Sequence, residues 1–258
     1  MSGYILCQVK KAQKPYFIEN ISTNIYSIEE LCFYLCHNLY LVDESIRNEE
    51  LLRWLEEELG LGKLAVKLQS HLRRNEALEE FLYPILKEIN YLSYEEMRSL
   101  NGQLDKMEEE PLVIHRKKRG DCLVENGMYV NAIQTYREAL KAEEPRPGFY
   151  AGIYHNLGCA YSYLFQKEEA LECFEKAYGI SHTLSALRTF LIAFYHCKGK
   201  EAYESKLKEL EVDITTRQKI QEEIDRIKEQ SATIEVEEKE IDSVLERLTV
   251  EYHRSTSA

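Results

Sequence analysis

The sequence predicts a mainly α-helical protein, and three observations support this prediction. Only 11 Gly and 5 Pro occur among 258 residues, and both residue types interrupt helices. Apolar residues recur at intervals of three and four over most of the chain. Ser27 with Glu30, and Ser93 with Glu96, form the S-x-x-E pattern that caps the start of a helix. We therefore expect helices over nearly the whole chain.

An N-terminal domain, mostly helical, is expected over residues 1–110. The apolar runs 4–9 and 16–19 are separated by a basic segment that contains Pro15, and they predict a small β-hairpin. Two strands alone are marginally stable in water, so the hairpin must pack on the helices that follow. Over residues 20–110 the apolar spacing and the capping signals predict four to five helices with short connections.

The composition restricts the class of protein. Apolar side chains make up 44% of the chain and charged ones 30%, which is compatible with a buried core. The seven cysteines form no C-x-x-C pair, and the first residues lack the features of a secretion signal, so we expect reduced thiols in the cytoplasm. No apolar stretch reaches the ~18 residues of a membrane helix. The net charge is −12, and residues 201–258 hold sixteen Asp and Glu against nine Lys and Arg, which argues against binding to nucleic acid.

Residues 111–200 contain an internal repeat. When Gly120 is aligned with Gly158, three pairs follow at equal offsets: Ala132 with Ala170, Tyr136 with Phe174, and Ala139 with Ala177. Small residues allow two helices to approach closely, and aromatic side chains fill the space between neighbouring helix pairs. The repeat predicts helix pairs at 113–146 and 151–184, followed by a degenerate third pair that begins near Ser185.

This pattern resembles the tetratricopeptide repeat, a helix-turn-helix unit of about 34 residues. The resemblance covers residues 112–200 and implies a right-handed helical superhelix in which the first helix of each pair lines a concave groove. By this register the groove residues are Lys117, Asp121, Val124, His155, Asn156, Cys159, Ser162, Tyr163, Thr189, Phe190 and His196, with Ala193 and Cys197 beside them. Some members of the family bind a terminal carboxylate with Lys and Asn residues. Lys117 and Asn156 match that clamp but Asp121 and Thr189 do not, so a peptide of mixed character is expected instead.

Residues 201–258 contain neither Gly nor Pro and predict a long acidic helix with a frayed end. A heptad pattern is formed by Ile220, Ile224, Ile227, Ile234, Ile241, Leu245, Leu248 and Tyr252, with polar interruptions at Ser231 and Glu238. One interpretation is a coiled coil that forms a homodimer or docks a partner. The other is a long solvated helix, or a helical hairpin that packs this apolar seam onto the preceding repeats.

Two cysteine–histidine clusters suggest chemistry, but packing explains both. Cys32 and Cys36 lie one helical turn apart, yet zinc requires four convergent ligands and no second pair is near them in the sequence. His155 and Cys159 have the same spacing, without a visible triad partner or anion hole. The basic segment 115–120 would attract phosphate or an acidic partner, or it is a solvated helix face, or it pairs with the acidic C-terminal segment. We expect no catalytic residue, metal site or cofactor.

The function that these features predict is that of a non-catalytic cytoplasmic adaptor or scaffold that binds a protein or peptide in the groove of residues 112–200. An alternative is a regulator or sensor whose N-terminal domain binds another macromolecule in response to a peptide. That alternative requires a basic recognition helix, for which residues 67–74 are the candidate. A third possibility, an enzyme, would require a pocket with perturbed titratable groups.

Overall fold

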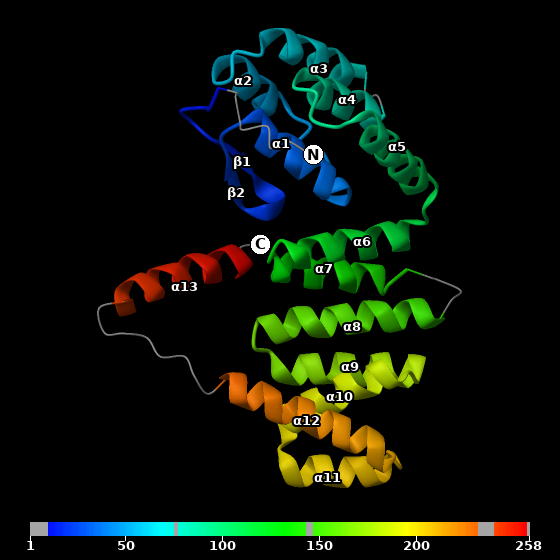
Figure 1. Cartoon of the computed structure of the whole chain (residues 1–258). Helices are drawn as coiled ribbons and strands as arrows, with labels where there is room; N and C mark the ends of the chain where they lie inside the picture. The colour runs from blue at the N-terminus through cyan, green and yellow to red at the C-terminus, as the bar shows by residue number, and fades with distance from the viewer. Residues whose placement is uncertain (1–9, 75–76, 143–146, 232–239, 257–258) are drawn as a thin grey trace. The chain divides into compact units, whose positions relative to one another are not determined.

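The computed structural model describes residues 10–74, 77–142, 147–231 and 240–256. Over these residues it contains thirteen α-helices and one two-stranded sheet (Figure 1), so the predicted mainly α-helical fold is confirmed. Contacts within the chain divide it into an N-terminal unit, residues 1–126, and a C-terminal unit, residues 127–258. The boundary expected from the sequence was at residue 110. The contacts instead group the helix over Leu112–Glu125 with the N-terminal unit.

The hairpin is formed by strands β1 (Tyr16–Ile18) and β2 (Thr23–Ile25), which pair antiparallel. The strand expected at 16–19 is thus present, but its partner is β2. The other expected strand, 4–9, lies outside the described residues. A short 3-10 turn, η1 (Glu19–Ile21), and Ser22 with φ of 45° reverse the chain between the strands.

Six α-helices complete the described part of the N-terminal unit: α1 (Ile28–His37), α2 (Glu49–Glu57), α3 (Gly62–Arg74), α4 (Leu78–Glu88), α5 (Tyr94–Glu109) and α6 (Leu112–Glu125). A 3-10 turn, η2 (Leu39–Leu41), follows α1. Ser27 and Ser93 form the two predicted capping boxes, and the side chain of Asn48 caps α2. The starts of α1, α2 and α5 could therefore be predicted from the sequence.

The hairpin packs on the helices, as its small size requires. The ring of Tyr16 lies 5.8 Å from that of Trp54 in α2, and the Trp54 indole N–H donates to the carbonyl of Lys14 at 2.9 Å. The core of the N-terminal unit contains Tyr34 and Phe81, which are 2% and 0% exposed.

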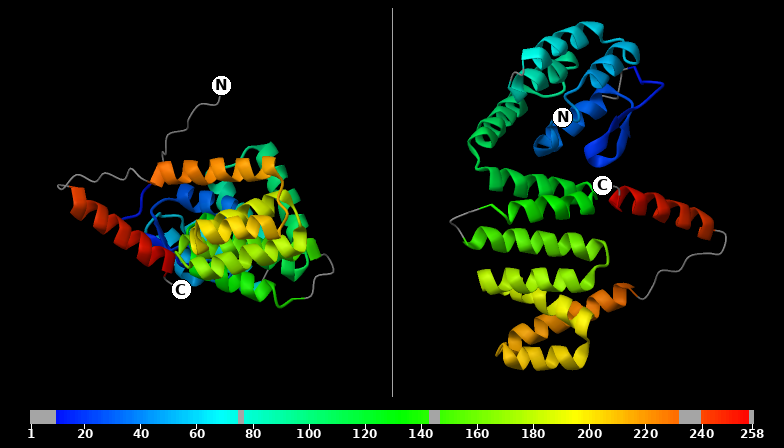
Figure 2. Two further views of the ribbon diagram at one scale, coloured as in Figure 1. Left: turned by 90° about the horizontal axis from the view of Figure 1, so that it is seen from below. Right: turned by 180° about the vertical axis from the view of Figure 1, so that it is seen from behind.

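Seven helices form the described part of the C-terminal unit: α7 (Tyr129–Ala139), α8 (Pro147–Tyr163), α9 (Lys167–Ser181), α10 (Leu184–Lys198), α11 (Lys200–Glu209), α12 (Ile214–Ser231) and α13 (Ile241–Thr256). From α8 to α11 each helix packs against the one before it (Figures 1 and 2). Helix α12 then turns back onto α10, and α13 contacts α7. The result is a stack of helices in which α12 packs on α10.

The prediction of one long helix over 201–258 is wrong. Helix α11 ends at Glu209 because Glu211 adopts a left-handed conformation, φ of 50°, and the Val212 N–H donates to the Leu207 carbonyl at 3.1 Å. The Asp213 carboxylate then accepts from the Thr216 N–H at 2.9 Å and caps the start of α12. This turn requires neither Gly nor Pro, the residues whose absence suggested a continuous helix.

The heptad positions are used in two ways. Ile220 and Ile224 in α12 are 1% and 0% exposed, so this part of the pattern packs within the C-terminal unit. Leu245 and Leu248 in α13 are 56% and 50% exposed, and for this helix the coiled coil stays a prediction. Ile234 lies outside the described residues.

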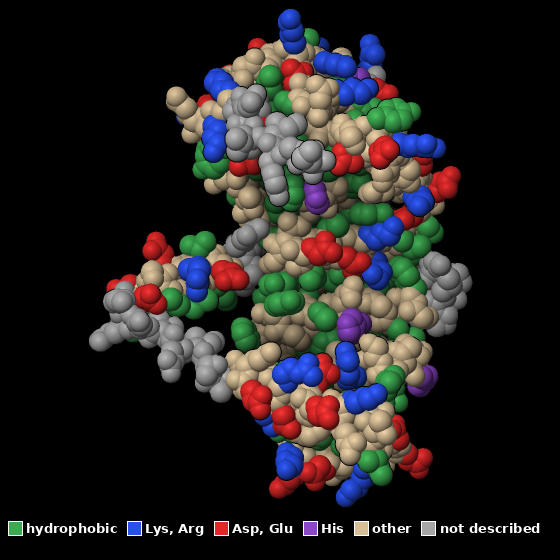
Figure 3. Space-filling view, viewed as in Figure 1, with side chains coloured by type: hydrophobic (Ala, Val, Ile, Leu, Met, Phe, Trp, Pro, Cys, Tyr) green, Lys and Arg blue, Asp and Glu red, His purple; other side chains and the backbone are tan. Residues whose placement is uncertain are grey.

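On the outer face of α11 and α12, positive and negative side chains are intermixed (Figure 3).

Candidate functional site

The second repeat is the pair α8 and α9, and Gly158 sets the distance between the two helices. A Cβ atom at Gly158 would lie 2.7 Å from the ring of Phe174, closer than two carbon atoms can approach without displacement. Leu157 and Tyr161 in α8 and Ala170 in α9 are also buried. The close packing predicted from the repeat is therefore present at the expected residues.

The third pair, α10 and α11, is held by α12. The guanidinium of Arg188 in α10 forms an ion pair with Glu223 of α12 at 3.3 Å. The Lys228 ammonium donates to the Tyr195 hydroxyl at 2.5 Å and lies 4.5 Å from the centre of its ring. Polar contacts at two places along α10 thus fix α12 across the last repeat.

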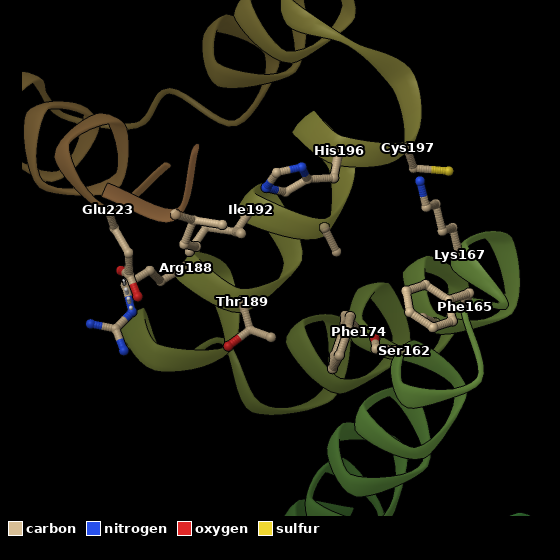
Figure 4. A pocket seen from close by; sticks show the side chains of 13 residues that line it. Ser162, Phe165, Lys167, Phe174, Arg188, Thr189, Ile192, His196, Cys197 and Glu223 are labelled. Atoms are coloured by element: carbon tan, nitrogen blue, oxygen red, sulfur yellow. Dashed lines mark ion pairs between the residues drawn. The ribbon is translucent and has the colours of Figure 1, made fainter. Parts of the chain in front are cut away.

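A cavity of about 450 Å³ opens between α8, α9, α10 and α12 (Figure 4). Apolar side chains form its middle, among them Phe174, Ile192 and Ile227. The Arg188–Glu223 ion pair lies at one end, whereas Phe165, from the turn between α8 and α9, and Lys167, the first residue of α9, lie at the other. An apolar cavity with a few polar groups at its edges is typical of a binding site.

Three of the groove residues expected from the sequence line this cavity, namely Ser162, Thr189 and His196, together with their predicted neighbours Ala193 and Cys197. The others on α8, which are His155, Asn156, Cys159 and Tyr163, lie outside its described lining. Tyr163 is 59% exposed and stacks on Tyr129, with ring centres 4.4 Å apart. Of the groove residues expected on α8, only Ser162 therefore lines the cavity.

Phe190 is not a groove residue. Its side chain is 2% exposed and packs between the rings of Tyr178 and Phe194, 6.1 and 5.8 Å away. The assignment of Phe190 to the groove is corrected accordingly.

Three more expected groove residues, Lys117, Asp121 and Val124, belong to α6 and so to the N-terminal unit. Lys117 and Asp121 form an ion pair at 2.7 Å along the helix. The cavity described here consists of residues of the C-terminal unit, and Lys117, Asp121 and Val124 are not part of its lining.

The basic segment 115–120 binds partners inside the N-terminal unit. Arg119 donates to the Asp43 carboxylate at 2.8 Å and to the Tyr40 carbonyl at 3.1 Å. Lys118 donates to the Tyr40 hydroxyl at 2.8 Å and forms an ion pair with Glu110. Arg119 stands where the repeat pattern has leucine, and this contact is the reason for the departure.

The titratable groups of α8 favour packing over nucleophilic chemistry. Burial raises the pKa of the Cys159 thiol, which keeps it protonated, and lowers the pKa of the His155 imidazole, which keeps it neutral. An activated Cys–His pair requires a negatively charged thiolate and a positively charged imidazolium. Within the described ranges no cluster of His, Cys, Asp and Glu is arranged to hold a metal ion.

Several cavity residues were not anticipated, including Phe165, Lys167, Phe174, Arg188, Ile192, Glu223 and Ile227. Phe174 was placed as a packing residue, and it is one, because it is 5% exposed while one side meets the cavity. For Phe165 a signal existed in the alignment, since it occupies the position of Gly127 in the preceding repeat.

A model of the family described as tetratricopeptide repeat matches residues 151–181. The chain contains a tetratricopeptide repeat. The matched residues comprise helices α8 and α9 except for the start of α8, so the tetratricopeptide repeat recognised by the family model is the one built around Gly158. The N-terminal unit has no family match. Comparisons with curated proteins and with solved structures found no match to this chain.

Tetratricopeptide repeats generally mediate protein–protein interaction and are in general not catalytic. Across the described helices, none combines the length and the apolar character needed to cross a membrane.

Proposed function

We propose that the C-terminal unit binds a segment of another protein in the cavity between α8, α9, α10 and α12, and that the chain acts as a non-catalytic cytoplasmic adaptor or scaffold. The observation that supports this proposal is the cavity itself, which two successive helix pairs form and α12 closes on one side. Its volume, about 450 Å³, accommodates one or two large side chains of a peptide.

The polar groups at the edges of the cavity orient the backbone of a bound peptide through hydrogen bonds. Thr189 and Ser162 present hydroxyl groups, and His196 an imidazole, around an apolar centre. Burial, followed by the positive charges of Lys167 and Lys228, lowers the pKa of His196, so its neutral ring both donates and accepts hydrogen bonds near pH 7. These groups suit a peptide that inserts apolar side chains and leaves its backbone amides at the rim.

The test is selection of binders from a library of random peptides displayed on phage, with the intact protein as bait. We expect peptides that bind the native chain and not an Ala193→Phe variant, in which a phenyl ring fills the cavity. Tyr94→Ala, an exposed aromatic of the N-terminal unit, is the control and should bind the same peptides. If no peptide is enriched, or if Ala193→Phe binds them equally well, the proposal is wrong.

The alternative of a sensor with a macromolecule-binding N-terminal unit stays a prediction. Its candidate segment, 67–74, forms the second half of α3, and His71, Arg73 and Arg74 lie in the last turn of that helix. His71 and Arg74 each take part in an interaction within the structure, so the segment is not simply an open basic face.

A further inference from the structure

The turn inside each helix pair contains one residue with a positive φ, and the three pairs differ in which residue type it is. These residues are Gly127, Phe165 and Gly199, with φ of 75°, 57° and 81°, and Gly199, with ψ of 176°, lies outside the left-handed helical region. At Phe165 the hydrogen bonds are those of a Schellman motif, since the Phe165 N–H donates to the Ser162 carbonyl at 3.0 Å and the Gln166 N–H to the Tyr161 carbonyl at 3.0 Å. Glycine is the usual residue at this position because it has no Cβ.

Phenylalanine is an unfavourable choice for this turn. A left-handed conformation brings the Cβ atom close to the backbone, and only Gly, Asn and Asp adopt it at small cost. The other non-glycine residues with positive φ in the described chain are polar: Ser22, Asn90, His182 and Glu211. Phe165 is the large apolar exception.

Packing does not offset this cost. The side chain of Phe165 is 84% exposed, whereas Phe174 and Phe190 in the same unit are 5% and 2% exposed. The exposed ring nevertheless lines the cavity, at the end formed by the α8–α9 turn (Figure 4). A strained backbone that presents an exposed aromatic ring at the edge of an apolar cavity indicates a binding role for that ring.

The lining of this end of the cavity carries the positive charge of Lys167, while the Glu168 carboxylate, which is not part of the lining, accepts from the Cys197 thiol at 3.9 Å. Glu223 neutralises Arg188 at the far end, at 3.3 Å, and His196 is neutral near pH 7. The ammonium group of Lys167, two residues after Phe165, forms no ion pair with the described residues. An acidic group of a ligand placed beside Phe165 would therefore meet an available opposite charge.

We propose that Phe165 and Lys167 determine the specificity of the cavity, which takes a peptide with an apolar side chain next to Asp or Glu. The Phe165 ring covers the inserted apolar side chain, and the Lys167 ammonium pairs with the acidic neighbour at the rim. This inference rests on the proposed function, because it assigns the ligand chemistry of the same cavity.

Phe165→Gly is a sharp test, because it removes the ring and places the residue found in the neighbouring repeats at the strained position. With peptides selected on the native protein, we expect a midpoint of thermal unfolding equal to or above that of the native chain and affinity about tenfold lower or worse. Phe165→Tyr keeps a ring and should retain binding. Tyr94→Ala is the matched control, since Tyr94 is 85% exposed and does not line the cavity.

Lys167→Glu tests the charge. The native protein should select peptides in which Asp or Glu follows or precedes an apolar residue, and Lys167→Glu should select Lys or Arg at that position instead. The inference is wrong if Phe165→Gly binds the selected peptides as well as the native protein, or if these peptides show no acidic preference. Peptides lost by Ala193→Phe but insensitive to Phe165→Gly overturn this inference and leave the proposed function standing, whereas a failure to select any peptide overturns both.

Discussion

Gly158 in α8 and Phe174 in α9 are in such close contact that a Cβ atom on the glycine would lie 2.7 Å from the Cε1 atom of the ring. Both residues are buried, and Phe174 is 5% exposed. We expect Gly158→Ala to lower the free energy of unfolding by about 1–3 kcal/mol, because the added methyl group forces the two helices apart. Urea denaturation followed by circular dichroism measures this change.

Gly179→Ala is the control for that substitution. Gly179 lies in α9, and an added Cβ atom meets no heavy atom within 4 Å. Alanine favours the helix, so this variant should be more stable than the native protein by up to about 1 kcal/mol. Equal effects of the two substitutions would contradict the assignment of Gly158 as a spacing residue.

The ion pair of Arg119 with Asp43 fixes α6 in the N-terminal unit. Burial alone would raise the pKa of Asp43, but hydrogen bonds from Ser45 and the charge of Arg119 hold it below its usual value. We expect Arg119→Leu, which restores the residue typical of the repeat, to destabilise the chain by about 1 kcal/mol. A double-mutant cycle with Asp43→Asn isolates the interaction, and a coupling energy of zero would show that the contact contributes nothing.

The His155 imidazole is half-buried beside Phe174, with ring centres 5.7 Å apart, and burial lowers its pKa. In the unfolded chain the same group titrates near pH 6.5. Because the folded state binds the proton less readily, the stability contributed by the neutral ring is present above about pH 6.5 and is lost as pH falls through the folded pKa. Urea denaturation between about pH 7.5 and pH 5.5 should show a smaller loss of stability for His155→Asn than for the native chain. An identical pH dependence for both proteins would refute the prediction.

The exposed apolar side chains of α13 predict self-association. Leu245 and Leu248, with Ile241 and Tyr252 in the same heptad positions, are 43–64% exposed. We expect light scattering to give the mass of a dimer, with Leu245→Lys in combination with Leu248→Lys giving a monomer. The double variant of Ile220 and Ile224 is unsuitable here, because these residues are buried within the unit. A monomeric native chain at every concentration would exclude the coiled coil.

Local patterns in the sequence identified the features that depend on local contacts. The capping boxes at Ser27 and Ser93 join residues three apart, and the Gly158–Phe174 contact joins two helices of one repeat. Features that depend on distant partners left no such pattern. Arg119 was recognisable as a departure from the repeat, but its partner Asp43 is 76 residues away, and only the folded chain reveals the pair.

The turn at Glu211 was missed, and the role of Phe165 in the predicted turn of the second repeat was not recognised, because ordinary residues occupy positions where glycine is the usual signal. Glu211 ends α11 in a left-handed conformation, and Phe165 does the same after α8. In both cases the hydrogen bonds of the turn, and not the residue type, determine the conformation. The cavity was only partly anticipated for a related reason, since α12 supplies Glu223 and Ile227 and its return onto α10 depends on that first turn.

The contacts of Lys118 and Arg119 have a consequence for anyone who studies the repeats in isolation. A fragment that begins at residue 111 loses Tyr40, Asp43 and Glu110, the groups that bind these two basic side chains in the intact chain. The sequence HRKKRG would then face solvent near the new N-terminus, where its charges attract polyanions such as nucleic acid or heparin. Binding to such polymers by the fragment would be an artefact of truncation and would not describe the native protein.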